Sequence, residues 1–165
     1  MESIKVFAPA TVANVVCGFD ILGFAVNEPG DELTMELTNK PGVNIISIEG
    51  DEGKLPLDPT KNTVSASVMN LLTDLGREDV GFNLKLKKKM PMGSGLGSSS
   101  ASAIAGLFAA NELLGKPLTK LELLPYAMQG EALACGHGHA DNVAPALFGG
   151  FTLIKSYEPL EVIAL

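Results

Sequence analysis

The chain has no tryptophan and only two cysteines, Cys17 and Cys135, among its 165 residues. Two cysteines do not make the disulfide framework of a small secreted domain, so we expect a reducing, cytoplasmic setting. No run of about 18 apolar residues is present, which argues against a helix that spans a membrane. Residues 1–5 also lack the pattern of a secretory signal. Neither a membrane partner nor a secreted, disulfide-rich fold is therefore expected.

Positive charge is scarce as well. Lysine and arginine together number 12 against 19 acidic residues, the net charge is −7, and Arg77 is the single arginine. An acidic chain with few aromatic rings is a poor candidate for binding nucleic acid. Its one basic cluster contains Lys85, Lys87, Lys88 and Lys89. This cluster is either a solvated strand end or, because a glycine-rich segment follows it, part of a site for a polyphosphate.

That glycine-rich segment covers residues 91–102 and leads into an alanine-rich helix expected over 98–114. Glycines at 93, 95 and 97 allow tight turns and close approach to a ligand. The small residues that follow add N–H groups without bulk, and the helix start adds free N–H groups and a positive dipole end. These features predict a cradle for an anion, most often phosphate. The segment matches neither the Walker A motif nor the dinucleotide-binding fingerprint, and a tight strand-to-helix turn is the alternative interpretation.

Hydrophobic periodicity predicts a chain of mixed α and β elements. Pro125 falls inside one expected helix, which it either kinks or forces to begin later. The apolar stretch 160–165 resembles the interior of a domain, which favours a fragment of a longer protein, with a simple C-terminal strand as the alternative. We expect strands at 4–8, 19–26, 32–37, 43–48, 82–87 and 151–155, helices at 62–75, 98–114 and from Thr119 onward, and a short helical segment at 141–147.

Glu131 interrupts the apolar stripe of its expected helix, since Ala127 and Met128 lie four and three residues before it. A buried carboxylate is costly unless a cation or hydrogen bonds compensate it. Mg²⁺ held between Glu131, Ser98 or Ser99 and phosphate oxygens would provide this compensation. The alternative is that Glu131 lies at a partly exposed edge of the stripe.

Two further segments combine polar residues with turn-forming ones. Cys135, His137, His139 and Asp141 alternate along the chain, which suggests zinc, but the glycine spacers favour a turn that forms the wall of a pocket. Asp141 and Asn142 could equally cap the next helix. Asn14 and Asp20 interrupt an apolar N-terminal stretch, where turn formation is the ordinary explanation.

Four segments, in order, carry a family resemblance. Residues 91–100 resemble the phosphate loop of the GHMP small-molecule kinases, and residues 8–20, 130–131 and 139–150 resemble the homoserine kinases within that family. The resemblance covers nearly the whole chain but only about the N-terminal half of such a kinase. It implies an α+β fold, the GHMP-kinase N-terminal domain (ribosomal protein S5 domain 2-like). This ATP-binding domain would span residues 1–165 and contain a left-handed βαβ unit, with the C-terminal domain absent from the chain.

The resemblance also implies roles for individual residues. Asn62, Thr63 and Val64 would lie on the adenosine side of ATP, with Lys87 near the base. Ser98 or Ser99 would hold Mg²⁺ together with Glu131. Asn14, Asp20 and Asn142 would bind L-homoserine. Asn14, Asn142 and Glu131 would form the catalytic set. No strong general base is evident, so catalysis would rest on orientation and on stabilisation of the transferred phosphoryl group. The residues expected around the triphosphate are Pro91, Met92, Gly93, Ser94, Gly95, Leu96, Gly97, Ser98, Ser99, Ser100 and Ala101.

The activity implied is ATP-dependent phosphorylation of L-homoserine to O-phospho-L-homoserine in threonine biosynthesis, by a cytoplasmic enzyme for which a homodimer fits the family. Another GHMP kinase and a non-catalytic nucleotide-binding fragment are the alternatives. In this family the arginines that hold the substrate carboxylate come from the C-terminal half. Arg77 lies far from every motif. The chain alone therefore lacks the carboxylate clamp, and we expect it to fold but to be inactive.

Overall fold

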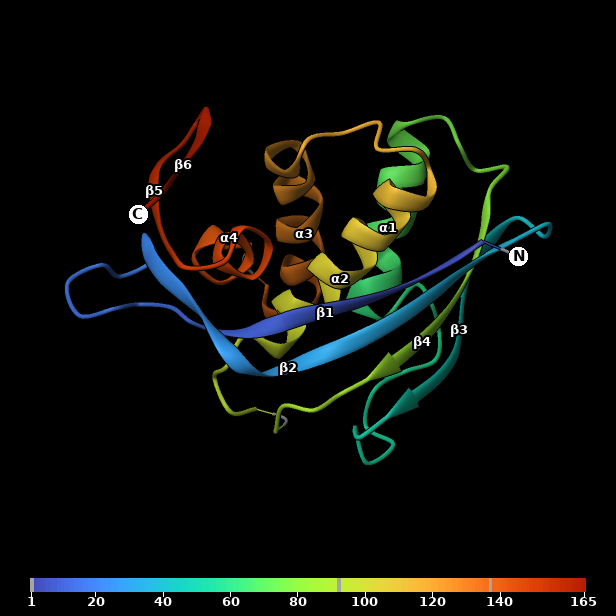
Figure 1. Ribbon diagram of the computed structural model, residues 1–165, viewed down its shortest axis with the longest axis horizontal. Coiled ribbons are helices and arrows are strands. Elements are labelled where there is room, and N and C mark those ends of the chain that lie inside the picture. Colours follow the sequence, from blue (N-terminus) through green and yellow to red (C-terminus); the bar gives the residue numbers. More distant parts are fainter. Residues whose placement is uncertain (1, 92, 137) are drawn as a thin grey trace.

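A computed structural model describes residues 2–91, 93–136 and 138–165. Its strands form one mixed sheet, and four helices cover one face of that sheet (Figure 1). The α+β architecture expected from the sequence is confirmed. The strands are β1 (Ser3–Val12), β2 (Leu22–Thr38), β3 (Gly42–Glu49), β4 (Gly81–Lys87), β5 (Phe151–Tyr157) and β6 (Leu160–Ala164); the helices are α1 (Thr63–Asp74), α2 (Ser98–Leu113), α3 (Lys120–Cys135) and α4 (Ala140–Phe148).

The long strand β2 organises the sheet. The strand order is β3-β4-β2-β5-β6, and β1 also pairs with β2. Only β3 and β4 are parallel among the described pairs, and the chain passes between them through α1, which makes a βαβ unit. The glycine-rich segment follows β4 and leads directly into α2. The sheet thereby presents this loop beside the beginning of α1.

Alternation along the strands builds the core between the sheet and the helices. In β4 the side chains of Phe82, Leu84 and Leu86 are buried, while Lys85 and Lys87 are exposed. Burying each large apolar side chain contributes roughly 1.5–3 kcal/mol. Helix α2 is built mostly from small residues, and a Cβ added at Gly106 would lie 2.6 Å from Val64 Cγ2 of α1. This close packing sets the middle of α2 against the first turn of α1.

Two expectations about the elements need correction. The predicted strands 19–26 and 32–37 are one strand, β2, which runs past Pro29. The pairing of β1 with β2 shifts from Pro9↔Gly30 to Thr11↔Ala25, so residues 26–29 bulge out of the β1–β2 pairing. Pro29, which has no N–H group, therefore removes no hydrogen bond between the two strands. Helix α3 begins at Lys120 with the expected capping box and runs through Pro125, so a later start is wrong.

The remaining elements follow the sequence pattern. The apolar stretch 160–165 contributes β6, which pairs with β5. Gly76 follows α1 with a φ of 61°, as expected for a helix-ending glycine. Within the described residues, every helix is too short or too polar to cross a membrane.

Candidate functional site

A cavity of about 440 Å³ opens between the glycine loop and the beginnings of α1 and α2. Side chains from α3 and α4 complete its wall. The residues that line it come from six segments of the chain: Leu55, Pro56, Lys61, Asn62, Thr63, Leu86, Lys88, Pro91, residues 93–100, Ser102, Glu131 and Asn142. The topology therefore gathers one polar site from positions far apart in the sequence.

The glycine loop has a backbone that other residues would not adopt easily. Gly93, Gly95 and Gly97 have φ values of 70°, 74° and 64°, in the left-handed region that favours glycine. A Cβ at Gly97 would also lie 2.0 Å from Thr11 Oγ1. Among the described residues no side chain caps the beginning of α2. Its first N–H groups and positive dipole end therefore face the cavity and favour an anion there.

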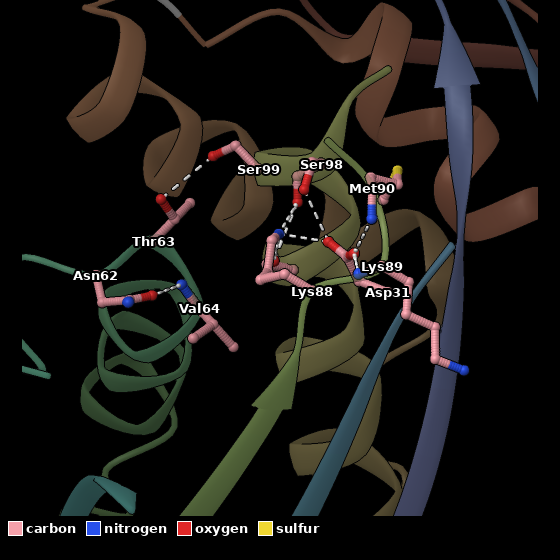
Figure 2. Close-up of polar contacts among 10 residues, drawn as sticks. Asp31, Asn62, Thr63, Val64, Lys88, Lys89, Met90, Ser98 and Ser99 are labelled. Carbon is pink, nitrogen blue, oxygen red and sulfur yellow. Dashed lines mark hydrogen bonds and ion pairs between the residues drawn. The ribbon is translucent and has the colours of Figure 1, made fainter. Parts of the chain in front are cut away.

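The beginning of α1 forms the opposite wall. Asn62 caps this helix: its Oδ1 accepts a hydrogen bond from Val64 N (3.3 Å), and its Nδ2 donates to the Pro56 carbonyl (2.9 Å). The hydroxyls of Ser99 and Thr63 lie 3.3 Å apart and link the two helix starts (Figure 2). The amide of Asn62 is thus occupied in shaping the wall.

Beneath the loop lies a buried ion pair between Asp31 of β2 and Lys88, the residue after β4 (Figure 2). Burial lowers the pKa of the Lys88 ammonium, and the Asp31 carboxylate opposes that effect. The other lysines of the basic cluster point to carboxylates on the sheet surface. The nitrogen Nζ of Lys85 lies 3.4 Å from Glu36, that of Lys87 lies 3.7 Å from Glu49, and that of Lys89 lies 2.6 Å from Glu32.

Glu131 reaches the cavity from α3. Its Oε1 atom is buried and, among the described residues, accepts no hydrogen bond. A buried carboxylate oxygen without a partner is expensive. Because carboxylate oxygens are preferred ligands of Mg²⁺, this orphaned atom fits a cation bound in the cavity.

A second cavity, of about 310 Å³, is lined by Asp20, Gly138, His139 and Tyr157. Asn14 Oδ1 accepts a hydrogen bond from Asp20 N (2.9 Å), and the Asp20 carboxylate lies 3.6 Å from His139 Nδ1. Tyr157 donates to the Asp20 carbonyl (2.7 Å). Asn14 and Asp20 have left-handed backbones (φ 57° and 59°), a conformation that Asn and Asp tolerate. Turn formation thus accounts for their backbone, while the Asp20 side chain lines the second cavity and Asn14 holds the Asp20 backbone.

The structure brings together many of the residues expected at the site: Asn62, Pro91, residues 93–100, Glu131 and Asn142 all line the first cavity. It leaves Asn14 and Asp20 outside that lining. Lys87 is exposed, with its ammonium near Glu49. Ala101 is fully buried and its N–H donates to the Gly97 carbonyl (2.8 Å), so it has no donor for a ligand.

Three other expectations concern residues at the margin of the site. Met92 and His137 lie outside the described residues. In the part of the chain that the structure describes, no cluster of three or more potential ligands supports the zinc alternative. Arg77 follows α1, and its guanidinium lies 3.5 Å from Asp79, away from the cavity lining.

Sequence reasoning did not single out Asp31 or Thr11, and it considered Lys88 only as one member of the basic cluster that could help to hold a polyphosphate. Continuing the alternation of buried residues 82, 84 and 86 places Lys88 on the inner face, so that signal was available. Asp31 gave no such signal, because it lay between two strands that were expected to be separate. Thr11 is fully buried; its hydroxyl donates to Asn142 Oδ1 (2.8 Å) and its N–H donates to the Leu96 carbonyl (3.0 Å).

A glycine-rich loop between a strand and an uncapped helix start, on a mixed sheet covered by helices, is the arrangement of a phosphate-binding domain. The family model described as GHMP kinases N terminal domain matches residues 62–150, and the chain belongs to this family. The resemblance on which the sequence analysis relied is thereby confirmed.

Homoserine kinases are among the proteins to which the chain is similar over its whole length. Those of Chlorobium phaeovibrioides and Chloroherpeton thalassium are 54% and 53% identical over all of this chain and 54% of their own length. The crystal structure of homoserine kinase from Cytophaga hutchinsonii has a TM-score of 0.94 at 61% identity, over all of this chain and 52% of that one. The chain thus spans about half the length of these relatives. The Methanococcus jannaschii mevalonate kinase (TM-score 0.75, 19% identity) shares the fold.

Proposed function

We propose that this chain is the ATP-binding part of a homoserine kinase. The whole protein would transfer the terminal phosphoryl group of ATP to the hydroxyl of L-homoserine, giving ADP and O-phospho-L-homoserine for threonine biosynthesis. The observation that carries the proposal is the loop of three left-handed glycines that joins an uncapped helix start at a 440 Å³ cavity. The identity to homoserine kinases supports the choice of substrate.

ATP would bind with its triphosphate against residues 93–100, whose N–H groups and helix dipole stabilise negative charge. The base would lie toward Leu55, Pro56 and Asn62, since Leu55 and Pro56 give this end of the lining its apolar surface. Lys87, which the resemblance places near the base, is not among the residues that line this cavity, and its exposed ammonium lies 3.7 Å from Glu49.

Mg²⁺ would be held by Glu131 and Ser99. The buried, unpartnered oxygen of Glu131 fits a cation. Of the two candidate serines, Ser98 donates its hydroxyl to Asp31 (2.8 Å), whereas the hydroxyl of Ser99 lies in the cavity wall 3.3 Å from Thr63. When bound, the ion would neutralise charge on the phosphate oxygens.

L-homoserine would lie between the two cavities. Asp20 suits the substrate ammonium, and Asn142, which lines the first cavity, would orient the reacting hydroxyl. Asn14 would act through its hydrogen bond to Asp20 N, which fixes the turn that carries that carboxylate. These residues accelerate transfer by orientation rather than by accepting a proton. A cytoplasmic location and a homodimer belong to the same proposal.

Two measurements test the proposal. Isothermal titration of this chain with ATP and Mg²⁺ should show one nucleotide bound, whereas absence of binding contradicts the assignment. The full-length protein should form ADP with L-homoserine and not with mevalonate or galactose. Activity with one of the latter would replace the substrate but keep the family, and nucleotide binding without any turnover by the full-length protein would favour a non-catalytic role.

A further inference from the structure

The stability of the fold does not by itself explain why the ion pair Asp31–Lys88 is buried under the glycine loop. Both side chains are almost fully buried (0% and 3% exposed) under the glycine loop. A buried ion pair generally stabilises a fold little more than well-packed apolar residues of the same volume, because both charges lose their hydration. The hydrogen bonds that the two side chains make to the neighbouring backbone are therefore the better guide to the role of this ion pair.

Lys88 binds the segment that leaves the loop. Its ammonium donates to Asp31, to the carbonyl oxygen of Ser98 (2.9 Å) and to the hydroxyl of Ser102 (2.7 Å). These three acceptors use all three N–H donors of a lysine. Although Lys88 lines the cavity, it therefore has no donor left for a bound anion (Figure 2).

Asp31 binds the segment that enters the loop. Its Oδ1 accepts hydrogen bonds from the backbone N–H groups of Lys89 (2.8 Å) and Met90 (3.3 Å). Its Oδ2 accepts from the hydroxyl of Ser98 (2.8 Å) in addition to Lys88. One carboxylate thus contacts the chain both before and after the glycines.

We propose that Asp31 and Lys88 are positioning residues that clamp the two ends of the glycine loop and keep it in the shape that receives a triphosphate. They act without touching the nucleotide. A loop with three glycines loses much conformational entropy when it becomes ordered. Ordering it before the ligand arrives removes that cost from binding. The inference rests on the proposed binding of ATP by this loop.

The test compares this chain with the double variant Asp31→Leu/Lys88→Met, which replaces both charges with apolar groups of similar size and should still fold. We expect the Kd for ATP with Mg²⁺ to rise at least about tenfold, a loss typical of a disordered binding element. Hydrogen exchange at the amides of residues 93–97, measured without nucleotide, should become faster while the amides of β4 keep their protection. The matched control is Lys85→Met, which removes one positive charge from the surface of the same strand and should change Kd less than about twofold.

A folded double variant with unchanged Kd and unchanged exchange in the loop overturns the clamp. If the double variant does not fold, the near-isosteric Asp31→Asn serves instead, and it too should bind ATP more weakly and exchange faster in the loop; no change in either quantity overturns the proposal. Should the parent chain bind no ATP, the proposed function fails. Exchange in the nucleotide-free loop then still decides whether the clamp orders it.

Discussion

Gly97 lies where the glycine loop, β1 and α4 meet. Its φ of 64° is strained for any other residue, and an added Cβ would come within 2.0 Å of Thr11 Oγ1 and 2.9 Å of Asn142 Oδ1. We predict that Gly97→Ala destabilises the chain by about 2–4 kcal/mol, since a left-handed alanine costs about 1–2 kcal/mol and the clash adds to this. ATP binding should be lost as well, because the clash displaces the loop.

The control for this substitution is Gly53→Ala. Gly53 also has a left-handed φ (71°), but nothing lies within 4 Å of an added Cβ. Gly53→Ala should therefore lower the free energy of unfolding only by the cost of a left-handed alanine, about 1–2 kcal/mol, and leave the affinity for ATP unchanged. Urea unfolding and ATP titration measure both effects, and equal losses for the two variants would contradict this explanation.

Glu131 contributes an unpartnered carboxylate oxygen to the buried side of the cavity. We predict that Glu131→Gln removes most of the Mg²⁺ dependence of ATP binding, because the neutral amide no longer attracts the ion. Without Mg²⁺ the variant should be about as stable as the parent, since a buried carboxylate oxygen that accepts no hydrogen bond has been removed. Thermal unfolding and ATP titrations with and without Mg²⁺ check this, with the exposed Glu52→Gln as control. A large fall in melting temperature without the metal would show that Glu131 has a structural partner.

At the scale of elements, the first turn of α4 carries a buried acid. Burial raises the pKa of Asp141, while His139 and the N–H of Asn142 oppose the shift. The folded state therefore holds the Asp141 proton more tightly than the unfolded state does. The contribution of Asp141 to the free energy of unfolding is fully present below the ordinary Asp pKa. It is lost as pH rises through the higher pKa of the folded state. Asp141→Asn should therefore raise the melting temperature near pH 7, by about 2–4 °C for each kcal/mol regained.

The same substitution should have little effect near pH 3, where the carboxyl is protonated in both states. Melting temperatures of parent and variant across this pH range measure the difference. A variant that becomes relatively less stable as pH rises would contradict the direction of the shift. The matched variant Asp79→Asn changes an exposed acid (75% of its side chain is accessible) and should show no such pH trend.

The elements also show what the sequence could predict. Glycines, an alternating strand and a run of small residues were sufficient to find β4, the loop and α2, because each depends on local chemistry. Glu131 was identifiable because a charge stood in an apolar stripe. Asp31 was not, because its burial depends on β2 continuing past Pro29 and on a partner 57 positions away in the sequence. Pairing across the sheet is a tertiary property, and no local pattern encodes it.

At the scale of the whole molecule, the chain is acidic, with a net charge of −7, yet its proposed ligand is a polyanion. The lysines around the loop are already paired. Lys61 lies near Asp58, Lys85 near Glu36, Lys87 near Glu49, Lys88 against Asp31 and Lys89 near Glu32. We therefore expect the attraction for phosphate to come mainly from backbone N–H groups and the dipole of α2, which act over short distances.

If backbone N–H groups and the helix dipole provide the attraction, the Kd for ATP should depend only weakly on salt concentration. Added salt screens interactions between charges separated by more than about 10 Å at 0.1 M ionic strength, and here it would screen the repulsion between the acidic chain and ATP as much as any attraction. We expect the Kd for ATP with Mg²⁺ held at saturation to change less than about fivefold between 0.05 and 0.5 M KCl, as measured by titration calorimetry. The control Lys89→Met should leave this dependence unaltered. A weakening of more than tenfold in the parent would mean that unpaired lysines, rather than the loop backbone, hold the phosphates.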